Sequence, residues 1–411
     1  MHSSWANTSI SMDTGSETKP LIGKVEAAAL DRQPVCVVPS SSYDLRPSKW
    51  RDVSAEAWAS YDWQWQNRVM TCDDLLEITP LSEDERRAIE TFSRTFSLCV
   101  SPHYVALLRL ESGDSHPIRR QCIPTMAETE VIDCLMDDPL GEARHHYSGC
   151  GTRRYPDRAL VYTTHACAMR CRHCTRRCKV GRMEQPTHAS VMKTIDDICA
   201  DTRIRDVLLS GGDALSLSND EIEAMLGRLR ACPHIDVIRL CTRMPCTLPQ
   251  RMNDDVLLQT LARYAPIYVN TQFNHPLEAT DESAKALQLL RKAGCVIGNQ
   301  SVLLRGVNEN PKDHEALNRW LLRNGCRPYY LFLCDVAQGT YHFRTPIQTG
   351  FEIMAHLRGR LSGLGIPHYV VDLPDGMGKV DLAPGLVHCD SNIVHFRNWF
   401  GADVSYPDVF V

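Results

Sequence analysis

Three cysteines, Cys167, Cys171 and Cys174, stand at the spacing C-x3-C-x2-C within the segment THACAMRCRHCTRRC. Cysteine thiolates are soft ligands that suit iron, and three of them on one loop can hold three irons of a 4Fe–4S cube. The fourth iron then stays open to chelate a small molecule. Zinc is the alternative metal, and a chance grouping of cysteines is the alternative without a metal. Cys178 lies further along the chain, outside the spaced set.

The chain has 18 cysteines in 411 residues, scattered without the dense framework of a disulfide-rich secreted domain. Cys232, Cys241, Cys295 and Cys326 stand in apolar or element-edge segments, so we expect them to be structural residues. The only cysteines with ligand spacing are therefore the three on the 167–174 segment.

Composition excludes several classes of partner. The sequence is 43% hydrophobic and 23% charged with a formal net charge of −5, which gives no reason to expect nucleic acid as a partner. No apolar run approaches the roughly 20 residues that span a bilayer. The first 20 residues lack the charged start and apolar run of a secretory signal. We therefore expect a cytoplasmic protein without a membrane partner.

The elements that must position the cysteines fall into four segments. Residues 1–45 are rich in Ser, Thr and Pro, which predicts a disordered or extended segment. Over 46–146, apolar residues recur at helical spacing, which predicts four or five short helices. Within that region Ser82 and Glu85 stand at the spacing of a capping box.

From 147 to 384, short apolar runs alternate with amphipathic segments at about 30 residues, the period of β/α units. We expect helices between the strands, one of them capped by Ser218 and Glu221. Six such units and one last strand predict an α/β fold with an open, partial barrel, followed by a tail over 385–411. The predicted strands are 159–166, 205–211, 236–243, 266–273, 295–304, 329–335 and 368–374.

Polar residues gather where these predicted strands end. Cys167 follows the first strand and Gly211-Gly212-Asp213 follows the second, while Asp335 and Asp372 come at the ends of the last two. Because the carboxyl ends of parallel strands meet at one edge, we expect these side chains to form a single site. Gln272, Asn274 and Gln300 belong to the same expected edge.

The cysteine loop, together with a Gly-Gly-Asp segment after the second strand, resembles the radical S-adenosylmethionine (SAM) enzymes. Longer matches narrow the resemblance, over about 147–384, to the lysine 2,3-aminomutase family. They are RRYPDRALVYTTHACAMRCRHCTRR, RDVLLSGGDALSLS, NTQFNHP, GNQSVLLRGVN, RPYYLFLCD, HFRTP and YVVDLPDGMGK. The resemblance implies a (β/α)6 radical SAM barrel in which SAM contacts His173, Ser210, Gly211, Gly212, Asp213 and Gln300.

The family also uses pyridoxal 5′-phosphate (PLP), held by a lysine as a Schiff base. By position that catalytic lysine is Lys379, and Arg154, Tyr155 and Arg158 match family residues around PLP and its phosphate. Arginine suits phosphate because its charge is permanent and its fork is bidentate. The family has more glycine in the PDGMGK segment, where this chain has Asp375 and Met377.

The resemblance assigns three residues to the substrate. Arg176 corresponds to the arginine that pairs with the substrate carboxylate, and Asp335 and Asp372 correspond to the carboxylates that grip a side-chain cation. Relatives acting on glutamate replace these aspartates, and relatives that modify a protein lysine lack the second. The expected substrate is therefore a free basic amino acid. Lysine and arginine both stay open, because Phe332 and Leu333 replace the family's usual tyrosine and glutamine, and Asp375 adds an acid near the site.

The implied reaction is an isomerisation that moves the α-amino group to the β-carbon. A radical SAM enzyme without PLP that acts on a peptide or protein is the alternative, and a non-catalytic iron–sulfur protein is the remote one. The resemblance implies a flavodoxin- or ferredoxin-type electron donor and a homo-oligomer. We expect that oligomer to lack the family's zinc staple, because only Cys389 stands in the tail and Asn310 stands at the partner-cysteine position.

Overall fold

The protein was analysed as a computed structural model that describes residues 41–110, 116–181, 185–382, 386–390, 393–397 and 403–407. The predicted extended segment over 1–45 thus lies mostly outside the described residues. Its last five residues form a turn in which Ser42 is buried. The hydroxyls of Ser41 and Ser42 donate to Glu282 at 2.7 and 3.0 Å, so this end of the segment packs against a helix of the barrel.

Short helices occupy the described part of the region after this turn, as predicted, although six α-helices are present where four or five were expected. Serine side chains cap the first two of these helices, and Ser82 and Glu85 form the predicted capping box of α4. Because Ser60 accepts from the Trp63 N–H, one apolar-periodic stretch splits into α1 and α2. The helices are α1 (Ala55–Trp58), α2 (Tyr61–Gln66), α3 (Cys72–Leu76), α4 (Glu83–Thr91), α5 (Pro102–Ala106) and α6 (Pro117–Cys122), with 3-10 turns at Ser48–Trp50, Leu107–Arg109 and Met126–Thr129.

A nine-stranded sheet follows, with its strands in sequence order from β1 to β9. Strands β2 to β8 are parallel, which confirms the six β/α units and the last strand. The strands are β1 (Gly151–Tyr155), β2 (Arg158–Thr164), β3 (Asp206–Gly211), β4 (Val237–Cys241), β5 (Ile267–Thr271), β6 (Cys295–Leu303), β7 (Cys326–Leu333), β8 (His368–Leu373) and β9 (Gly378–Asp381).

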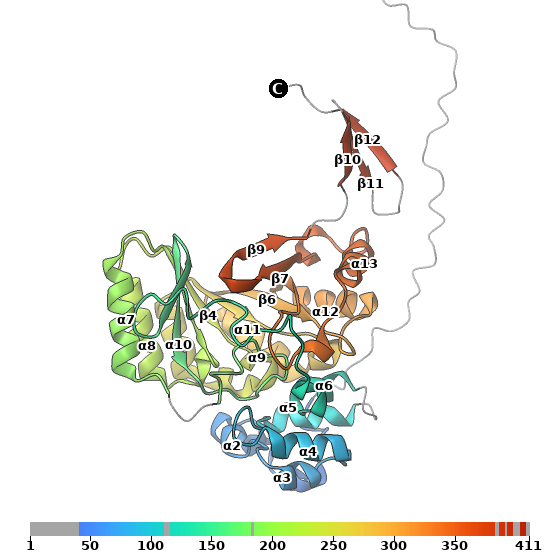
Figure 1. The fold of residues 1–411 in the computed structure, drawn as a ribbon. Helices are drawn as coiled ribbons and strands as arrows, with labels where there is room; N and C mark the ends of the chain where they lie inside the picture. Colours follow the sequence, from blue (N-terminus) through green and yellow to red (C-terminus); the bar gives the residue numbers. More distant parts are fainter. Residues whose placement is uncertain are drawn as a thin grey trace, which may run out of the picture. The chain divides into compact units, whose positions relative to one another are not determined.

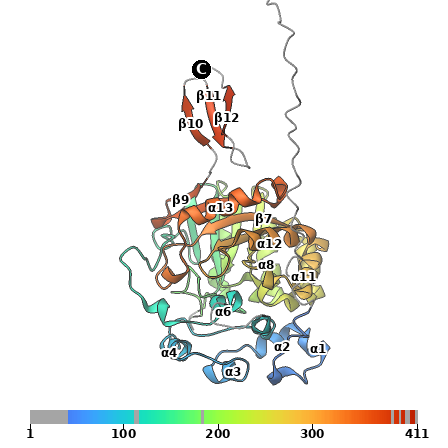
Figure 2. The ribbon, with the colours of Figure 1, turned by 90° about the vertical axis from the view of Figure 1, so that its right-hand side faces the viewer.

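Helices cover the outer side of this curved sheet (Figure 1). Figure 2, turned by 90°, shows α12 and α13 on the side that faces the viewer. Ser218 and Glu221 form the predicted capping box at the start of α8. The helices are α7 (His188–Ala200), α8 (Asn219–Arg230), α9 (Met244–Thr247), α10 (Asp255–Arg263), α11 (Asp281–Lys292), α12 (Pro311–Arg323) and α13 (Ile347–Leu357).

The two edge strands are the main departure from the predicted fold. The segment around Arg154 lies outside the predicted strands, yet Gly151–Tyr155 pairs antiparallel with β2. Lys379 likewise lies beyond the last predicted strand, which ends at 374, yet it is part of β9 and pairs with Asp372 of β8. The β8–β9 turn depends on Gly376 and Gly378, whose φ values of +75° and +96° are unfavourable for other residues. The glycines made this segment resemble a loop, so the β8–β9 hairpin was not predicted from the sequence.

One hydrophobic core runs from Trp50 in the helical region to Cys326 in β7, so the helices pack on the barrel. Cys232, Cys295 and Cys326 are buried in it as expected, whereas Cys241 is only half-buried. The segment expected as a tail contains an antiparallel sheet of β10 (Leu386–Asp390), β11 (Ile393–Arg397) and β12 (Asp403–Pro407). None of the described helices is both long and apolar enough to cross a membrane.

Candidate active site

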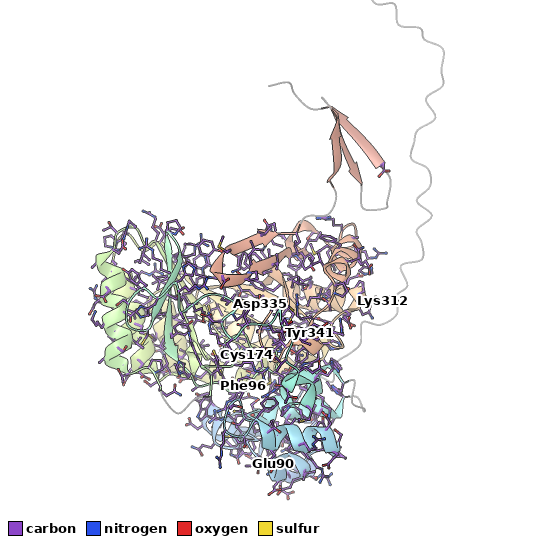
Figure 3. All side chains as sticks on the ribbon, in the orientation of Figure 1. Glu90, Phe96, Cys174, Lys312, Asp335 and Tyr341 are labelled. Atoms are coloured by element: carbon purple, nitrogen blue, oxygen red, sulfur yellow. The ribbon has the colours of Figure 1, made fainter. Side chains whose placement is uncertain are left out.

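A cavity of about 380 Å³ opens at the carboxyl ends of the strands. Figure 3 labels Cys174 and Asp335, two of its lining residues, which come from loops more than a hundred residues apart. Every residue assigned above to the cluster, SAM, PLP or substrate lines this cavity. They are Arg154, Tyr155, Arg158, Cys167, Cys171, His173, Cys174, Arg176, Ser210, Gly211, Gly212, Asp213, Gln300, Asp335, Asp372 and Lys379.

The strand-end residue Asn274 lies outside this lining. Its amide nitrogen donates to Gln121 at 2.9 Å and its amide oxygen accepts from the Val302 N–H, so it holds strand ends together. Asn310 likewise serves the fold, because its side chain caps α12 by accepting from the Lys312 N–H at 3.0 Å.

The N-terminal helices hold the cysteine loop from outside. The backbone N–H groups of Arg170 and Arg172 donate to the carbonyls of Cys99 and Gln121, both at 2.9 Å. The Arg68 guanidinium donates to the Cys167 carbonyl at 3.0 Å. These contacts join the loop backbone to elements far away in sequence. The helical region therefore serves as the outer support of the loop.

Glu128 strengthens this support with a buried charge network. It accepts two hydrogen bonds from Arg172, at 2.9 and 2.6 Å, and one from Arg177. Glu128 and Arg172 are almost completely buried, and a buried charge is tolerated only when it is paired and hydrogen-bonded. Nearby arginine charges outweigh burial and hold the pKa of Glu128 below its ordinary value.

The thiols themselves line the cavity wall. Burial, together with neighbouring Cys171, raises the pKa of Cys174 to about 11. Such a thiol keeps its proton until a metal displaces it. In the described part of the chain, no His, Cys, Asp or Glu side chains converge as a trio on a single ion. A 4Fe–4S cube binds each thiolate to a different iron, so it needs cysteines around a cavity rather than at one point.

Gly211 and Gly212 bring the second strand end against the cysteine loop. A Cβ on Gly211 would lie 2.4 Å from the Thr164 carbonyl oxygen, and one on Gly212 would lie 2.3 Å from that of Ala166. The Gly212 and Asp213 N–H groups donate to those same oxygens at 2.6 and 2.8 Å. These glycines are thus required by the approach of two protein loops, and not only by a ligand.

Arg243, which the sequence did not single out, completes this end of the cavity. Arg243, after β4, donates from Nη1 to the Cys171 sulfur at 2.8 Å and from Nη2 to Glu278 at 2.8 Å. Its backbone N–H donates to Asp213, whose other carboxylate oxygen accepts from the Leu215 N–H. Asp213 therefore positions backbone at the site. The signal for Arg243 was its place at a strand end, within CTRMP.

Arg176 is held by Glu142, a further residue that the sequence did not single out. Nε and Nη2 of Arg176 contact Glu142 Oε1 at 2.9 and 2.8 Å, and Nη1 donates to the Ser210 hydroxyl at 3.2 Å. Lys179 adds a contact to Glu142 at 3.5 Å. Arg176, together with Lys179 and Tyr162, outweighs the burial of Glu142 and lowers its pKa to about 2. The Arg176 fork thus already holds a carboxylate.

The opposite end of the cavity is built by the edge strands. Lys379 Nζ lies 3.1 Å from Asp372 Oδ2, and Arg154 Nη2 lies 3.4 Å from Asp372 Oδ1. The Lys379 backbone N–H donates to the Tyr155 hydroxyl at 3.0 Å. Residues from β1 and β9 therefore meet although these strands do not pair in the described sheet. Arg158 stacks on the Tyr155 ring at 4.6 Å.

Asp335 has a buried carboxylate oxygen, Oδ1, without a hydrogen-bond partner among the described residues. Burial, together with the nearby charge of Asp372, raises the pKa of Asp335 to about 7. A buried carboxylate with an empty acceptor is costly unless a cation comes to it.

Three residues at which this chain differs from the family pattern, Phe332, Leu333 and Asp375, lie on or after β7, and not all of them face the cavity. Phe332 lines the cavity, with its ring 5.3 Å from Lys379 Nζ. Leu333 points the other way into a hydrophobic cluster, as strand alternation requires. Asp375 is absent from the lining and lies 3.4 Å from Arg144. Asp375 therefore pairs with Arg144 instead of lining the cavity, although it lies on the turn between Asp372 and Lys379.

Comparisons with known proteins agree with this geometry. Residues 161–317 match the Radical SAM superfamily, and residues 354–409 match the Lysine-2,3-aminomutase family. The chain is 40% identical over 370 residues to L-lysine 2,3-aminomutase of Fusobacterium nucleatum, covering 90% of this chain and 87% of the relative. It is 39% identical over 360 residues to L-lysine 2,3-aminomutase of Clostridium subterminale, covering 87% and 86%. The chain belongs to the lysine 2,3-aminomutase family.

Another relative shows that overall identity does not separate substrates in the lysine 2,3-aminomutase family. Glutamate 2,3-aminomutase of Clostridioides difficile is 42% identical over 356 residues, covering 86% of this chain and 83% of the relative. Membership in the radical SAM superfamily implies a 4Fe–4S cluster and SAM as cofactors. The site fits both, since three thiols and a cation beside Cys171 share the cavity with His173, whose ring nitrogen lies 2.9 Å from Gln272.

Proposed function

We propose that this protein moves the α-amino group of a free basic L-amino acid, lysine or arginine, to the β-carbon, with SAM, a 4Fe–4S cluster and PLP as cofactors. The observation that carries the proposal is Asp335, whose buried Oδ1 has no partner among the described residues. It shares one cavity with the cysteine loop and Lys379. A cationic side chain supplies the partner that this oxygen lacks.

The charge around Asp335 supports a basic rather than an acidic substrate. Asp372 is close enough to raise the pKa of Asp335, so two carboxylates face the same part of the cavity. Lys379 and Arg154 already pair with Asp372, and the Asp372 side chain is only 7% exposed. A glutamate side chain placed here would add a third negative charge, whereas an ammonium or guanidinium group neutralises one.

The residues at the other strand edge support PLP binding. Arg154 Nη1 is buried and has no partner in the described part of the protein, which suits an arginine that awaits an anion. Arg158 and Tyr155 lie beside it, and Lys379 offers an amine on a strand held by Tyr155. When bound, PLP supplies an electron-poor π system through which nitrogen can move between neighbouring carbons.

The other side chains bind and orient the substrate. Arg176 receives the substrate carboxylate, and Glu142 and Ser210 fix its guanidinium until the substrate arrives. Asp335 binds the distant cation, and Asp372 joins it once the Lys379 amine moves away from its present position at 3.1 Å. Holding a substrate at both ends places its α- and β-carbons between the cluster and Lys379, which is the positioning that radical transfer requires.

Both lysine and arginine fit the proposed cation site, and the activity test below distinguishes them. Of the departures that favoured arginine, only Phe332 lines the cavity. An aromatic ring there can stack on a guanidinium and can also contact an ammonium group. We expect an external flavodoxin- or ferredoxin-type protein to supply the electron.

The test is anaerobic reconstitution with iron, sulfide, SAM and PLP, followed by incubation with lysine, arginine, ornithine or glutamate separately. Formation of β-lysine or β-arginine supports the proposal and names the substrate. Turnover of glutamate alone contradicts the cation site. Failure to bind PLP, with absorbance unchanged in Lys379→Ala, would favour a radical SAM enzyme that acts on a peptide or protein.

A further inference from the structure

Arg243 reaches the cysteine loop from the neighbouring strand end. The residue is only 7% exposed, and its Nη1 donates to the Cys171 sulfur at 2.8 Å. Among the described hydrogen bonds of the three loop cysteines, this one joins a permanent cation to a sulfur. The contact comes from β4 and not from the loop itself.

The remaining donors of Arg243 hold the guanidinium in one place. Nη2 donates to Gln121 at 2.6 Å and to Glu278 at 2.8 Å, and Nε donates to the Gln272 carbonyl at 3.2 Å. Glu278 is itself fixed by the Tyr104 hydroxyl at 2.6 Å. With all three of its nitrogens engaged, the guanidinium has no freedom to turn away from Cys171.

This network extends from the barrel into the N-terminal helices, since Gln121 lies on α6 and Tyr104 on α5. Neutralising Glu278 requires only the contact from Nη2, so it does not explain why Nη1 donates to the Cys171 sulfur. A purely structural ion pair and a sulfur-directed cation therefore predict different behaviour of a cluster bound at Cys171.

Hydrogen bonds and charge beside cluster sulfurs are the protein's main means of setting an iron–sulfur potential. Reduction adds one electron from an external low-potential donor and no proton, so the negative charge shared by the thiolates grows by one. A cation hydrogen-bonded to Cys171 favours that more negative state. Its removal leaves Glu278 uncompensated nearby, which acts in the same direction.

We propose that Arg243 is a positioning residue that raises the reduction potential of the 4Fe–4S cluster through its contact with Cys171. The proposal rests on the radical SAM assignment and not on the identity of the amino acid substrate. It also gives the N-terminal helices a part in the chemistry, because Gln121 and Tyr104 hold the groups that orient Arg243.

The test compares Arg243→Gln, Arg243→Lys and Arg170→Gln with the wild-type chain after anaerobic reconstitution. Arg170 is the matched control because it holds the same loop, through the Ser97 and Gly181 carbonyls at 3.2 and 3.4 Å, and none of its described hydrogen bonds goes to a cysteine sulfur. Iron and sulfide are counted first. The midpoint potential is then measured by electron paramagnetic resonance during redox titration, without any amino acid substrate.

For Arg243→Gln, we expect the equilibrium constant for one-electron reduction to fall at least tenfold, which is about 59 mV for a one-electron couple. Arg243→Lys keeps the positive charge but cannot reach both Cys171 and Glu278. Its midpoint potential should therefore lie between those of the wild type and Arg243→Gln. Arg170→Gln should match the wild type.

A loaded Arg243→Gln cluster with wild-type or higher potential overturns the proposal, and so does an equal shift in Arg170→Gln. If Arg243→Gln fails to hold iron, Arg243→Lys decides, and a wild-type potential there also overturns it. Because no amino acid is present, these results stand whichever substrate the enzyme uses.

Discussion

The loop that carries the three cysteines lies between the barrel and the N-terminal helices, whereas Lys379 lies on β9 at the open edge of the sheet. At the loop, protein groups meet protein groups: Arg243 contacts Cys171 and Glu278, and Arg172 contacts Glu128. At the edge, Asp335 Oδ1 and Arg154 Nη1 are buried without partners among the described residues.

This difference indicates how each end is completed. The cluster end is shaped by long-range contacts before any ligand binds, with His173 Nδ1 as an unpartnered atom there. The lysine end holds opposite charges that await an anion and a cation. Preorganisation at one end and unmet polar groups at the other suit a resident cluster and an exchanging substrate.

The largest effects are expected from variants that remove the cofactor at one end of the cavity and leave the cofactor at the other end bound. Cys171→Ala should lose iron but keep the PLP absorbance, and Lys379→Ala should lose that absorbance but keep iron. Either change should lower activity by roughly 10³-fold or more, as for residues that act in one unit. Iron analysis and absorbance spectra check this. Loss of both cofactors in either variant would contradict independent ends.

The next effect concerns the cation site. Asp335→Asn should raise the KM for the basic substrate by roughly 100-fold, because losing one partner of a buried charge pair costs about 2–5 kcal/mol. Asp372→Asn should act in the same direction. Asp375→Asn is the matched control, since Asp375 is partly exposed and pairs with Arg144, and its KM should change by less than about threefold. Wild-type KM in both site variants would refute the cation site.

The third effect is a pH dependence with a defined sign. The pKa of Asp335 is raised to about 7, mainly by burial, so near pH 6 most of the carboxyl is neutral. Binding of a cation requires the ionised form, so substrate affinity should rise about tenfold between pH 6 and 8. Because the pKa of Asp335 is raised from its ordinary value of 3.8, the stability of the ligand-free protein should fall as the pH rises from about 4 to about 7 and level off above that. Isothermal titration checks the affinity, and Asp335→Asn should flatten the profile.

The smallest effects test what holds the β8–β9 turn near the site. A Cβ on Gly141, whose φ is +61°, would lie 2.5 Å from the Asp375 carbonyl oxygen. Gly141→Ala should therefore cost about 1–3 kcal/mol and weaken PLP retention. Arg144→Ala removes only an exposed pair and should cost less than about 1 kcal/mol. Urea unfolding measures the loss of stability in both variants. Equal losses would indicate that the Arg144–Asp375 ion pair, and not the close packing at Gly141, holds the turn in place.

Local sequence patterns were enough to predict the regular elements and the cysteine loop. Apolar period predicted the parallel strands, Ser82 and Ser218 predicted their capping boxes, and thiol spacing predicted the loop at the end of β2. Because parallel strands end at one edge, residues such as Asp335 could be placed at the site from their position after a strand alone.

Which charged groups pair with each other could not be predicted from local sequence patterns. Glu142 with Arg176, Glu278 with Arg243, and Tyr155 with Lys379 are pairs that no local period encodes, the last separated by 224 residues. The physical reason is that a hydrogen bond depends on distance in space, which chain folding sets. Sequence thus located the chemistry, and folding decided which groups are already paired and which await a ligand.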